Sequence, residues 1–133
     1  MSEHPNVDLL RRGFGAFAVG DLVTLDGIFA DDATWHIDGR NRFSGDYEGK
    51  AAFTRFFLEY FGELTNETDT FGQEVHALFA DDEHGVALTK LTVTRGDDRL
   101  ESDNVMVFLF DDGLVTEVWL SAFDPYVEDE FWA

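Results

Sequence analysis

The sequence predicts an α+β domain in which helices come first and pack on one face of a curved, mostly antiparallel sheet. Two observations carry this prediction. Apolar residues recur at helical spacing in the first half of the chain, whereas extended segments joined by acidic and Gly-containing turns follow Asn66. Helices followed by a run of strands are typical of α+β domains. Because there is no linker, repeat or low-complexity tract, residues 1–133 are expected to form one domain.

The first half of the chain is expected to contain three helices. Pro5 suits a first helical turn, and from Val7 onward apolar residues recur at about the 3.6-residue spacing of an amphipathic helix. Gly20 and Asp21 should end this helix and cap the next one. We predict helices at residues 7–19, 22–29 and 50–64, an acidic corner at 31–32, a short strand at 33–37 and a Gly-rich loop at 44–49.

The second half of the chain is expected to form strands. The last three extended segments are joined by short acidic or Gly-containing turns, which predicts an antiparallel meander. Residues 105–110 are apolar at every position, whereas a sheet with one face in water alternates. The second face is therefore expected to meet the C-terminal tail or another subunit. We predict strands at residues 68–79, 85–94, 99–110 and 114–123.

The chain is strongly acidic. Its 28 Asp and Glu residues outnumber 9 Lys and Arg residues, which gives a formal net charge of −19. Such a surface repels a phosphate backbone, so we expect no nucleic-acid partner. The acids occur in scattered doublets, which favours adaptation to a salty, halophilic cytoplasm, where a Debye length of about 3 Å at 1 M salt screens self-repulsion. A basic partner is the alternative.

The sequence gives no sign of secretion or membrane insertion. No stretch approaches the roughly 20 apolar residues of a membrane-spanning helix. Residues 1–5 lack the basic region and the apolar run of a signal peptide. There is no cysteine, which excludes disulfides and thiol nucleophiles. We expect a cytoplasmic protein with no membrane partner.

Four stretches resemble the nuclear transport factor 2-like (NTF2-like) superfamily, in its polyketide cyclase (SnoaL-like) and ketosteroid isomerase-like branch. They are Phe-Ala-Asp-Asp-Ala-Thr-Trp at 29–35, Gly-Asp-Tyr-Glu-Gly at 45–49, Asp-Asp-Gly-Leu-Val-Thr-Glu at 111–117 and the ending at 124–132. The resemblance covers nearly the whole chain. It implies a cone-shaped half barrel whose concave face lines a cavity, and a homodimer that forms through the convex face of the sheet.

The resemblance does not extend to the catalytic residues of the steroid isomerases. Those enzymes use an Asp base and an oxyanion hole of a Tyr and a protonated Asp. Counted from the matching motifs, the three positions fall on Ile37, Gly13 and near Met106. None of these residues can supply the chemistry, so steroid isomerisation is not expected.

Asp38 and His76 are the candidate catalytic residues. Asp38 could act as a general base if a bulge turns it into the cavity, where desolvation would raise its pKa. The alternative is a solvated carboxylate that begins the Asp38–Gly39 turn. His76 is a candidate acid–base group. His36 and His76 lie on different predicted strands without a His-x-His element, so we expect no metal site and no cofactor.

Lys90 and Asn104 are candidate ligand-binding residues, because each interrupts an apolar strand. Lys90 either anchors an anionic or carbonyl ligand or forms a buried pair with an acid such as Glu74. Asn104 has the same strand parity as Met106, and a buried amide there must bond to the backbone or to a ligand.

Aromatic side chains are expected to line the cavity and to favour a flat hydrophobic ligand. An exposed Phe-Trp pair at the C-terminus would be a liability, so residues 126–132 are expected to dock, as a lid or as a strap on a neighbouring subunit. The cavity residues predicted with Lys90 and Asn104 are Trp35, Phe57, Tyr60, Trp119 and Phe123.

Three functions remain open from the sequence. The leading hypothesis is a dimeric protein that binds a hydrophobic or aromatic small molecule in an apolar cavity. The alternative is an isomerase, cyclase or hydrolase that acts on a hydrophobic carbonyl or epoxide substrate by acid–base catalysis. The third is a structural or protein-interaction module. An open cavity with an acid or base of shifted pKa would favour the enzyme, and a cavity filled by its own side chains would favour the module.

Overall fold

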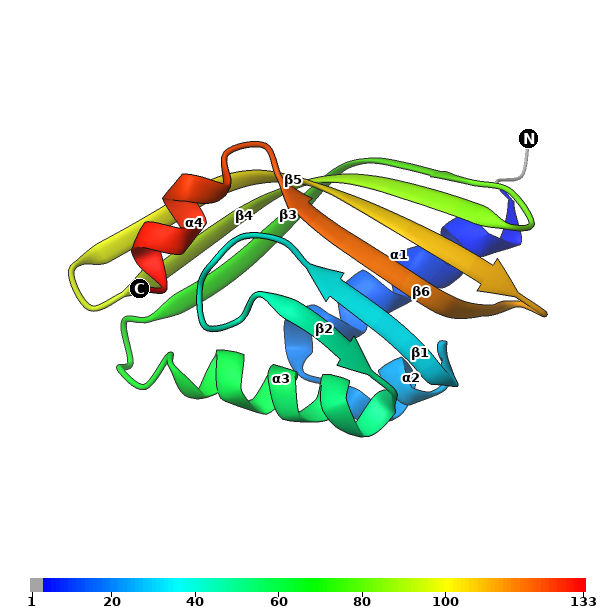
Figure 1. Ribbon diagram of the computed structural model, residues 1–133, viewed down its shortest axis with the longest axis horizontal. Coiled ribbons are helices and arrows are strands. Elements are labelled where there is room, and N and C mark those ends of the chain that lie inside the picture. Colours follow the sequence, from blue (N-terminus) through cyan, green and yellow to red (C-terminus); the bar gives the residue numbers. More distant parts are fainter. Residues whose placement is uncertain (1–3) are drawn as a thin grey trace.

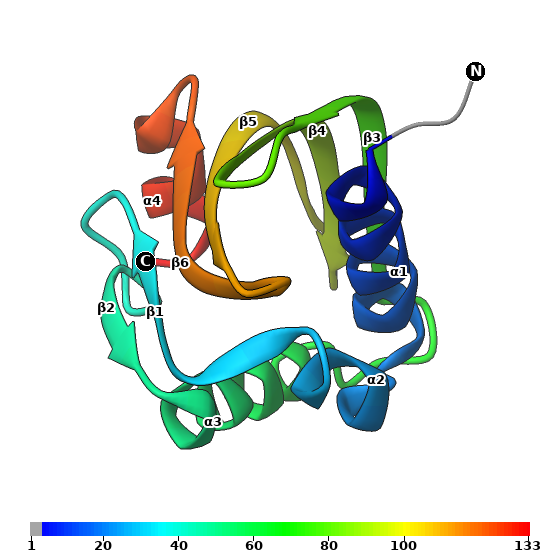
Figure 2. The same ribbon diagram turned by 90° about the vertical axis from the view of Figure 1, so that its right-hand side faces the viewer.

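The six strands form one sheet in the order β2-β1-β6-β5-β4-β3, which curves around the interior of the molecule (Figures 1 and 2). The computed structural model describes residues 4–133. Neighbouring strands are antiparallel except β1 and β6, which are parallel. The strands are β1 (Phe29–Ile37), β2 (Gly45–Glu48), β3 (Thr70–Ala80), β4 (His84–Arg95), β5 (Asp98–Asp111) and β6 (Leu114–Ala122). The helices are α1 (Pro5–Val19), α2 (Leu22–Asp26), α3 (Lys50–Gly62) and α4 (Pro125–Phe131). Within this described range no helix is long and apolar enough to cross a membrane.

The α+β class and the antiparallel meander of β4, β5 and β6 are confirmed. The prediction of three N-terminal helices on the sheet is too simple. Helix α2 has only five residues, because Gly27 caps it and donates its N–H to the Thr24 carbonyl. The predicted Gly-rich loop contains β2, in which Tyr47 pairs with Trp35 of β1. A fourth helix, α4, forms near the C-terminus.

Asp31 and Asp32 belong to strand β1 and do not form the predicted corner. Both are exposed, and the pairing of β1 with β6 shifts register between Phe29 and Thr34. An irregularity of this kind releases residues from the regular alternation of a strand. The two acids therefore stay in water, while Trp35 returns to the concave face and is buried.

Aromatic rings line the space between α1, α3 and the sheet. Trp35 of β1 stacks on Phe53 of α3 with ring centroids 4.4 Å apart. Such pairs contribute roughly 0.5–1.5 kcal/mol beyond the burial of their area, so they hold α3 against the concave face. Phe17 of α1 lies with its centroid 5.2–6.5 Å from the rings of Phe53, Phe57, Phe61 and Phe71.

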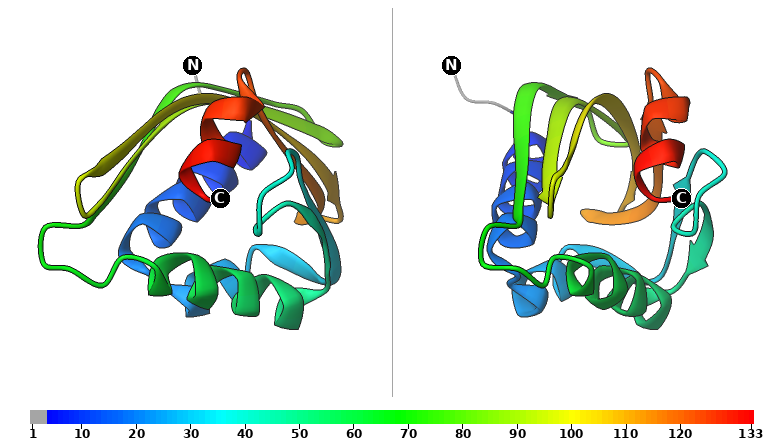
Figure 3. Two further views of the ribbon diagram at one scale, coloured as in Figure 1. Left: turned by 60° about the vertical axis from the view of Figure 1, so that its left-hand side comes forward. Right: turned by 90° about the vertical axis from the view of Figure 1, so that its left-hand side faces the viewer.

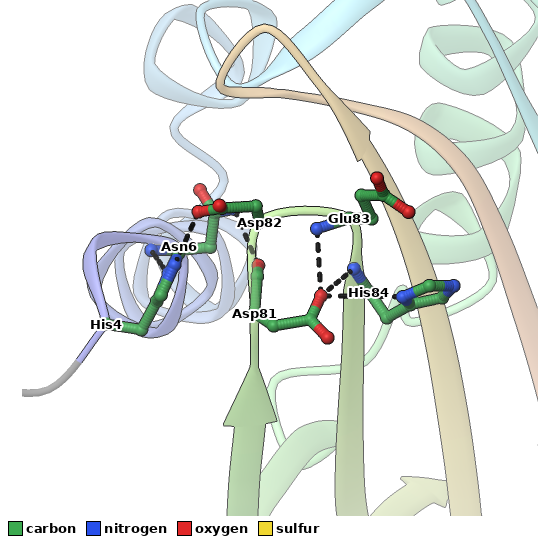
Figure 4. A network of polar contacts seen from close by, with 6 residues as sticks. All are labelled: His4, Asn6, Asp81, Asp82, Glu83 and His84. Carbon is green, nitrogen blue, oxygen red and sulfur yellow. Dashed lines mark hydrogen bonds and ion pairs between the residues drawn. The ribbon is translucent and has the colours of Figure 1, made fainter.

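The first turn of α1 is tied to the turn between β3 and β4 (Figure 4). His4 accepts the backbone N–H of Asn6 at Nδ1, and its Nε2 lies 2.8 Å from Asp82 Oδ1. The Asn6 amide donates to the Asp81 carbonyl at 3.0 Å. The Asp81 carboxylate accepts the N–H groups two and three residues further along, which lower its pKa. These contacts fix one end of α1 against the sheet.

Helix α4 closes one end of the cone (Figure 3). Trp132 follows it, is 2% exposed, and lies with its ring centroid 5.0 Å from Phe43 and 4.8 Å from Tyr60. Arg95 donates to the Phe131 carbonyl at 2.9 Å and lies over the Trp132 ring at 5.0 Å. The C-terminal segment is therefore docked, as expected, and it docks on its own chain.

The convex face of the sheet points away from α1, α2 and α3 (Figure 2). It carries Val107 and Trp119, which are partners in the β5–β6 register, and Val86, which is the β4 partner of Val107. All three are only partly buried. The apolar runs predicted to be buried on both faces thus have one face in the core and one face that helices α1 to α3 do not cover.

We predict that Trp132→Ala lowers the free energy of unfolding by about 3–5 kcal/mol, because the substitution leaves a large cavity among packed rings. Denaturant unfolding followed by far-UV circular dichroism would measure the change. Tyr126→Ala removes an aromatic residue of α4 that is 80% exposed and should change stability by no more than about 0.5 kcal/mol. Equal effects of the two substitutions would show that Trp132 does not anchor α4.

Candidate functional site

A cavity of about 130 Å³ lies between the concave face of the sheet and helices α1 and α3. Gly13 of α1 lines it and leaves space because it has no side chain, and Met106 and Val118 line it from the sheet. An engineered apolar cavity of about 150 Å³ binds benzene, so this space suits a ligand with about one aromatic ring. The aromatic lining residues are Phe14, Phe17, Phe29, Trp35, Phe43, Phe53, Phe56, Tyr60, Phe71, Phe108 and Trp132.

One end of the cavity is polar and is formed by the β1–β2 connection and α4. Asp38 accepts the backbone N–H of Ala122 at Oδ2, at 3.0 Å. Asp129 accepts the backbone N–H of Arg40 and the Asn41 amide at the same oxygen, Oδ1, at 2.8 and 3.0 Å. Asp38, Asn41 and Asp129 all line the cavity and are partly exposed. They place two carboxylates at its polar end.

Glu128 of α4 adds a third carboxylate. The Ser102 hydroxyl donates to Glu128 Oε2 at 3.0 Å. Burial raises the pKa of Glu128, and the charges of Asp38 and Asp129 raise it further, against the effect of the Ser102 hydrogen bond. Burial is also the main cause of the raised pKa of Asp38. Carboxyl groups with raised pKa values beside a cavity are typical of acid–base sites.

Asn104 lies beside this group on the concave face of β5. Its side chain is buried, with 2% exposure, and its amide nitrogen donates to the Ser102 carbonyl at 3.2 Å. Since a carbonyl only accepts hydrogen bonds, the nitrogen must face Ser102. The amide oxygen, Oδ1, is left buried without a partner in the described chain. An unpaired buried acceptor costs free energy, so this atom is a candidate contact for a ligand.

Tyr60 of α3 supplies a hydroxyl to the cavity wall. Its ring packs between Phe43 and Trp132, and it lines the cavity. Burial raises the pKa of Tyr60, with a smaller contribution from the charge of Glu128. The hydroxyl is therefore protonated at neutral pH and can donate a hydrogen bond.

The structure brings four of the predicted site residues together. Trp35, Tyr60 and Asn104 line the cavity, and Asp38 lies at its polar end. Asp38 follows the last residue of β1, where its backbone N–H still bonds to the Leu120 carbonyl of β6. Its side chain is partly exposed, borders the cavity and accepts the Ala122 N–H.

Lys90 and Trp119 do not line the cavity, because both lie on the convex face. On β4 the residues with the parity of Thr89 and Leu91 are buried on the concave side, so Lys90 points outward. There it is the register neighbour of Glu74 and Asp103, and its charge helps to lower the pKa of Glu101. Trp119 alternates with the buried Val118 and also points outward.

Phe57, Phe123 and His76 also lie outside the cavity. Phe57 is buried against Phe17 and Phe61, with centroids 5.2 and 4.7 Å away. Phe123 lies just beyond the end of β6 and is 66% exposed. His76 is exposed on β3, with its Nδ1 4.0 Å from Glu74 Oε1. The prediction that these side chains form part of the site is corrected, since a cavity ligand would not reach them.

His36 forms a separate polar cluster on the convex face. Its Nε2 lies 2.6 Å from Glu117 Oε2, its Nδ1 lies 2.7 Å from Asp46 Oδ1, and its ring stacks on Trp119. The hydrogen bonds to Glu117 and Asp46 raise the pKa of His36. Across residues 4–133 no group of three or more His, Asp or Glu side chains is arranged to hold a metal ion.

Sequence reasoning did not identify Glu128 and Asp129 as residues of the site. A signal was present, because residues 125, 128, 129 and 132 follow the i, i+3, i+4, i+7 spacing of one helix face. On α4 this face carries Pro125, Glu128, Asp129 and Trp132, and all four line the cavity.

Comparisons with known proteins agree on one fold. An uncharacterised protein of Mycobacterium tuberculosis is 25% identical over 133 residues, the full length of both chains. The structure of Bal32a, from a soil-derived mobile gene cassette, is 35% identical, covers 97% of each chain and has a TM-score of 0.89. TerC, co-crystallised with polyporic acid, is 17% identical, covers 96% of this chain and 97% of its own, and has a TM-score of 0.82.

These comparisons decide two expectations from the sequence. The relatives named here come from a mycobacterium and from soil, so they give no support to a halophilic source. The model of the SnoaL-like domain family matches residues 10–118, which is most of the chain. Bal32a shares the six-stranded, cone-shaped architecture over nearly its whole length. The chain therefore belongs to the SnoaL-like domain family and has the NTF2-like fold.

Proposed function

We propose that this protein binds a small hydrophobic or aromatic molecule in the central cavity. The observation that carries the proposal is the cavity itself, about 130 Å³ of space that the chain's own side chains leave unfilled. Protein interiors are normally close-packed, and cavities lined by apolar rings with a few polar groups are typical of ligand sites. A protein-interaction module has no need of such a space.

The fold neighbour TerC gives this proposal a precedent. Its structure was obtained by co-crystallisation with polyporic acid. Co-crystallisation with polyporic acid is an observation on TerC alone. The cavity of this chain suits a ligand of about one ring. The precedent supports a bound organic molecule in this fold and leaves its identity to experiment.

We predict that 2-phenylethanol, a neutral one-ring molecule, binds in the cavity. The three tryptophans provide an internal test, because Trp35 and Trp132 line the cavity and Trp119 lies on the convex face. Titration followed by 1H–15N NMR should move the indole N–H signals of Trp35 and Trp132 and leave that of Trp119 in place. Movement of Trp119 alone would place the ligand on the outer face and contradict the proposal.

A matched pair of glycine substitutions on α1 gives the control. Gly13→Leu places a side chain in the cavity and should abolish this binding, and a Cβ there meets Ile28 at an ordinary 3.5 Å. Gly15→Leu has nothing within 4 Å of the added Cβ and should bind like the unmodified protein. Both replace glycine in a helix, which favours the helix by about 0.8 kcal/mol. Loss of binding in both variants would contradict the cavity site.

Acid–base catalysis in the same cavity is the second candidate function. Glu128 and Asp38 favour it, because both carboxyl groups lie at the polar end and have raised pKa values. Raising the pKa of a carboxyl group moves it toward the range in which a general acid or base works best at physiological pH. Asn104 and the Tyr60 hydroxyl could orient or polarise a carbonyl or epoxide oxygen beside them. His76 is too far outside the cavity to take part.

The raised pKa of Glu128 predicts a pH-dependent change in stability. The folded chain holds this proton more tightly than the unfolded chain, so the contribution to stability is complete below the ordinary pKa of 4.5 and is lost as pH rises through the raised pKa. Glu128→Gln imitates the protonated form. It should raise the Tm at pH 7 and have little effect below pH 4.5.

Thermal melts from pH 4 to pH 8 would measure this difference. Glu67→Gln makes the same change of charge on an exposed residue and should leave the Tm within about one degree at each pH. A lower Tm of Glu128→Gln at pH 7 would show that the ionised carboxylate stabilises the fold, which would remove the physical basis for an acid–base role.

We also propose that two copies of the chain pair through the convex face of the sheet. The supporting observations are the apolar side chains at Val86, Val107 and Trp119, which α1 to α3 leave uncovered. Contiguous apolar surface of this kind on a sheet is typical of an interface. The polar cluster of His36, Asp46 and Glu117 would lie at the edge of that contact.

We predict a dimer in solution that Val107→Glu converts to a monomer, because a charge buried in an apolar interface is strongly unfavourable. Light scattering coupled to gel filtration would give the masses. Val23→Glu, on an α2 residue that is 86% exposed, should remain dimeric. A monomeric unmodified protein, or a dimeric Val107→Glu variant, would show the convex face not to be the interface.

A further inference from the structure

The charge of the cavity lining is one-sided. Asp38, Glu128 and Asp129 line it, and no Lys or Arg of residues 4–133 does. His36 also borders the cavity, but its ring nitrogens are bonded to Asp46 and Glu117 on the convex face. The hydrogen bonds to the three cavity carboxylates engage Oδ2 of Asp38, Oε2 of Glu128 and Oδ1 of Asp129. The second oxygens of Glu128 and Asp129 have no partner in the described chain. An anionic ligand would add to this repulsion, whereas a cation would relieve it.

Three arginines lie at or near this end, and none of them lines the cavity. Arg40 donates its backbone N–H to Asp129, and its side chain is exposed. Arg42 forms an ion pair with Glu63 and lies over the rings of Phe43 and Trp132. Arg95 bonds to a main-chain carbonyl and lies over the ring of Trp132. Both guanidinium groups pack on the rings of the aromatic wall, and neither lines the cavity. The positive charge that would balance the cavity therefore has to come from elsewhere.

The unpaired amide oxygen of Asn104 offers a hydrogen-bond acceptor to a ligand in the cavity. It is a buried acceptor next to Ser102, which also bonds to Glu128. Thr89, directly opposite Asn104 in the β4–β5 register, has an unpaired hydroxyl but does not line the cavity. A ligand group that donates hydrogen bonds would pair with Asn104 Oδ1 and with the open oxygen of Glu128 at the same time.

The aromatic walls also favour a cation. The faces of aromatic rings carry negative charge density, which attracts ammonium groups. Tyr60 and Trp132 pack against one another at 4.8 Å and both line the cavity close to Glu128, whose charge acts on Tyr60. The polar end therefore combines carboxylates, an acceptor and aromatic faces.

We propose that the cavity selects a hydrophobic primary amine, with its apolar, ring-sized body among the phenylalanines and its ammonium group between Glu128 and Asn104. This inference rests on the proposed ligand-binding function and adds the charge and the hydrogen-bonding group of the ligand. A primary ammonium group has three N–H donors, enough for Glu128, Asn104 and one of the carboxylates at the polar end.

Three molecules with the same phenyl ring test the proposal at pH 7. They are 2-phenylethylamine, which is cationic, 2-phenylethanol, which is neutral, and phenylacetate, which is anionic. Titrations followed by the indole N–H signals of Trp35 and Trp132 would give the three dissociation constants. We expect the amine to bind about tenfold more tightly than the alcohol, because a hydrogen bond to a charged group is worth about that factor. Phenylacetate should bind most weakly.

Two variants distinguish a direct contact between the amine and Glu128 from a general attraction of the amine to the acidic chain. Glu128→Gln should weaken amine binding by about threefold or more and should lower the ratio of amine affinity to alcohol affinity, because the shape and the Ser102 contact are kept. Glu67→Gln removes the same charge from the surface and should change neither. Equal loss of amine affinity in both variants would assign the preference to the net charge of −19 and overturn the proposed contact.

The outcomes distinguish this inference from the function on which it rests. If the alcohol binds and the amine binds no more tightly, the cavity is a ligand site without amine selectivity, and the further inference is wrong. If phenylacetate binds as tightly as the amine, it is also wrong. If none of the three moves the Trp35 or Trp132 signals, the proposed function itself fails.

Discussion

The packing of Trp132 between Phe43 and Tyr60 is the contact on which the candidate site depends. It holds α4 against the end of the cone, and α4 carries Glu128 and Asp129 on the same helical face as Trp132. If this ring did not dock, both carboxylates would be solvated and the raised pKa of Glu128 would return to the ordinary range. An apolar contact near the C-terminus therefore sets the electrostatics of a cavity built mostly from the first half of the chain.

The fold could be predicted from the sequence because its signals are local and repeated. Helical spacing after Pro5, the turn at residues 111–113 and three long extended segments specify the order of elements, and the quoted motifs resemble the family that the chain proved to belong to. The errors lie where local signals conflict with sheet pairing. Asp31 and Asp32 have turn-like composition, yet pairing with β6 on either side draws them into a strand. Likewise Tyr47 pairs with Trp35 despite the glycines around it.

The candidate site could be predicted only in part, because strand side chains alternate between faces. The sequence is apolar on both faces of β5 and β6, so it holds no signal for the inward parity, and an error of one residue reverses every side chain. Asn104 was placed correctly and Trp119 was not, for this reason alone. The position of Glu128 at the cavity depends on the docking of Trp132, a tertiary contact that composition could not show. The four-residue spacing between Glu128 and Trp132 was nevertheless a usable signal.

The uncompensated carboxylates connect stability to binding. With 9 Lys and Arg residues against 28 acids, the chain has few cations, and it uses Arg42 and Arg95 on the outside of the aromatic wall. At neutral pH the raised pKa values of Asp38 and Glu128 mean that ionising these groups weakens the fold. A ligand that binds only the folded chain stabilises it, and a cation would also remove the repulsion between the carboxylates. The groups that weaken the empty protein would thus strengthen the complex, which is the arrangement expected of a binding site and not of a core optimised for stability alone.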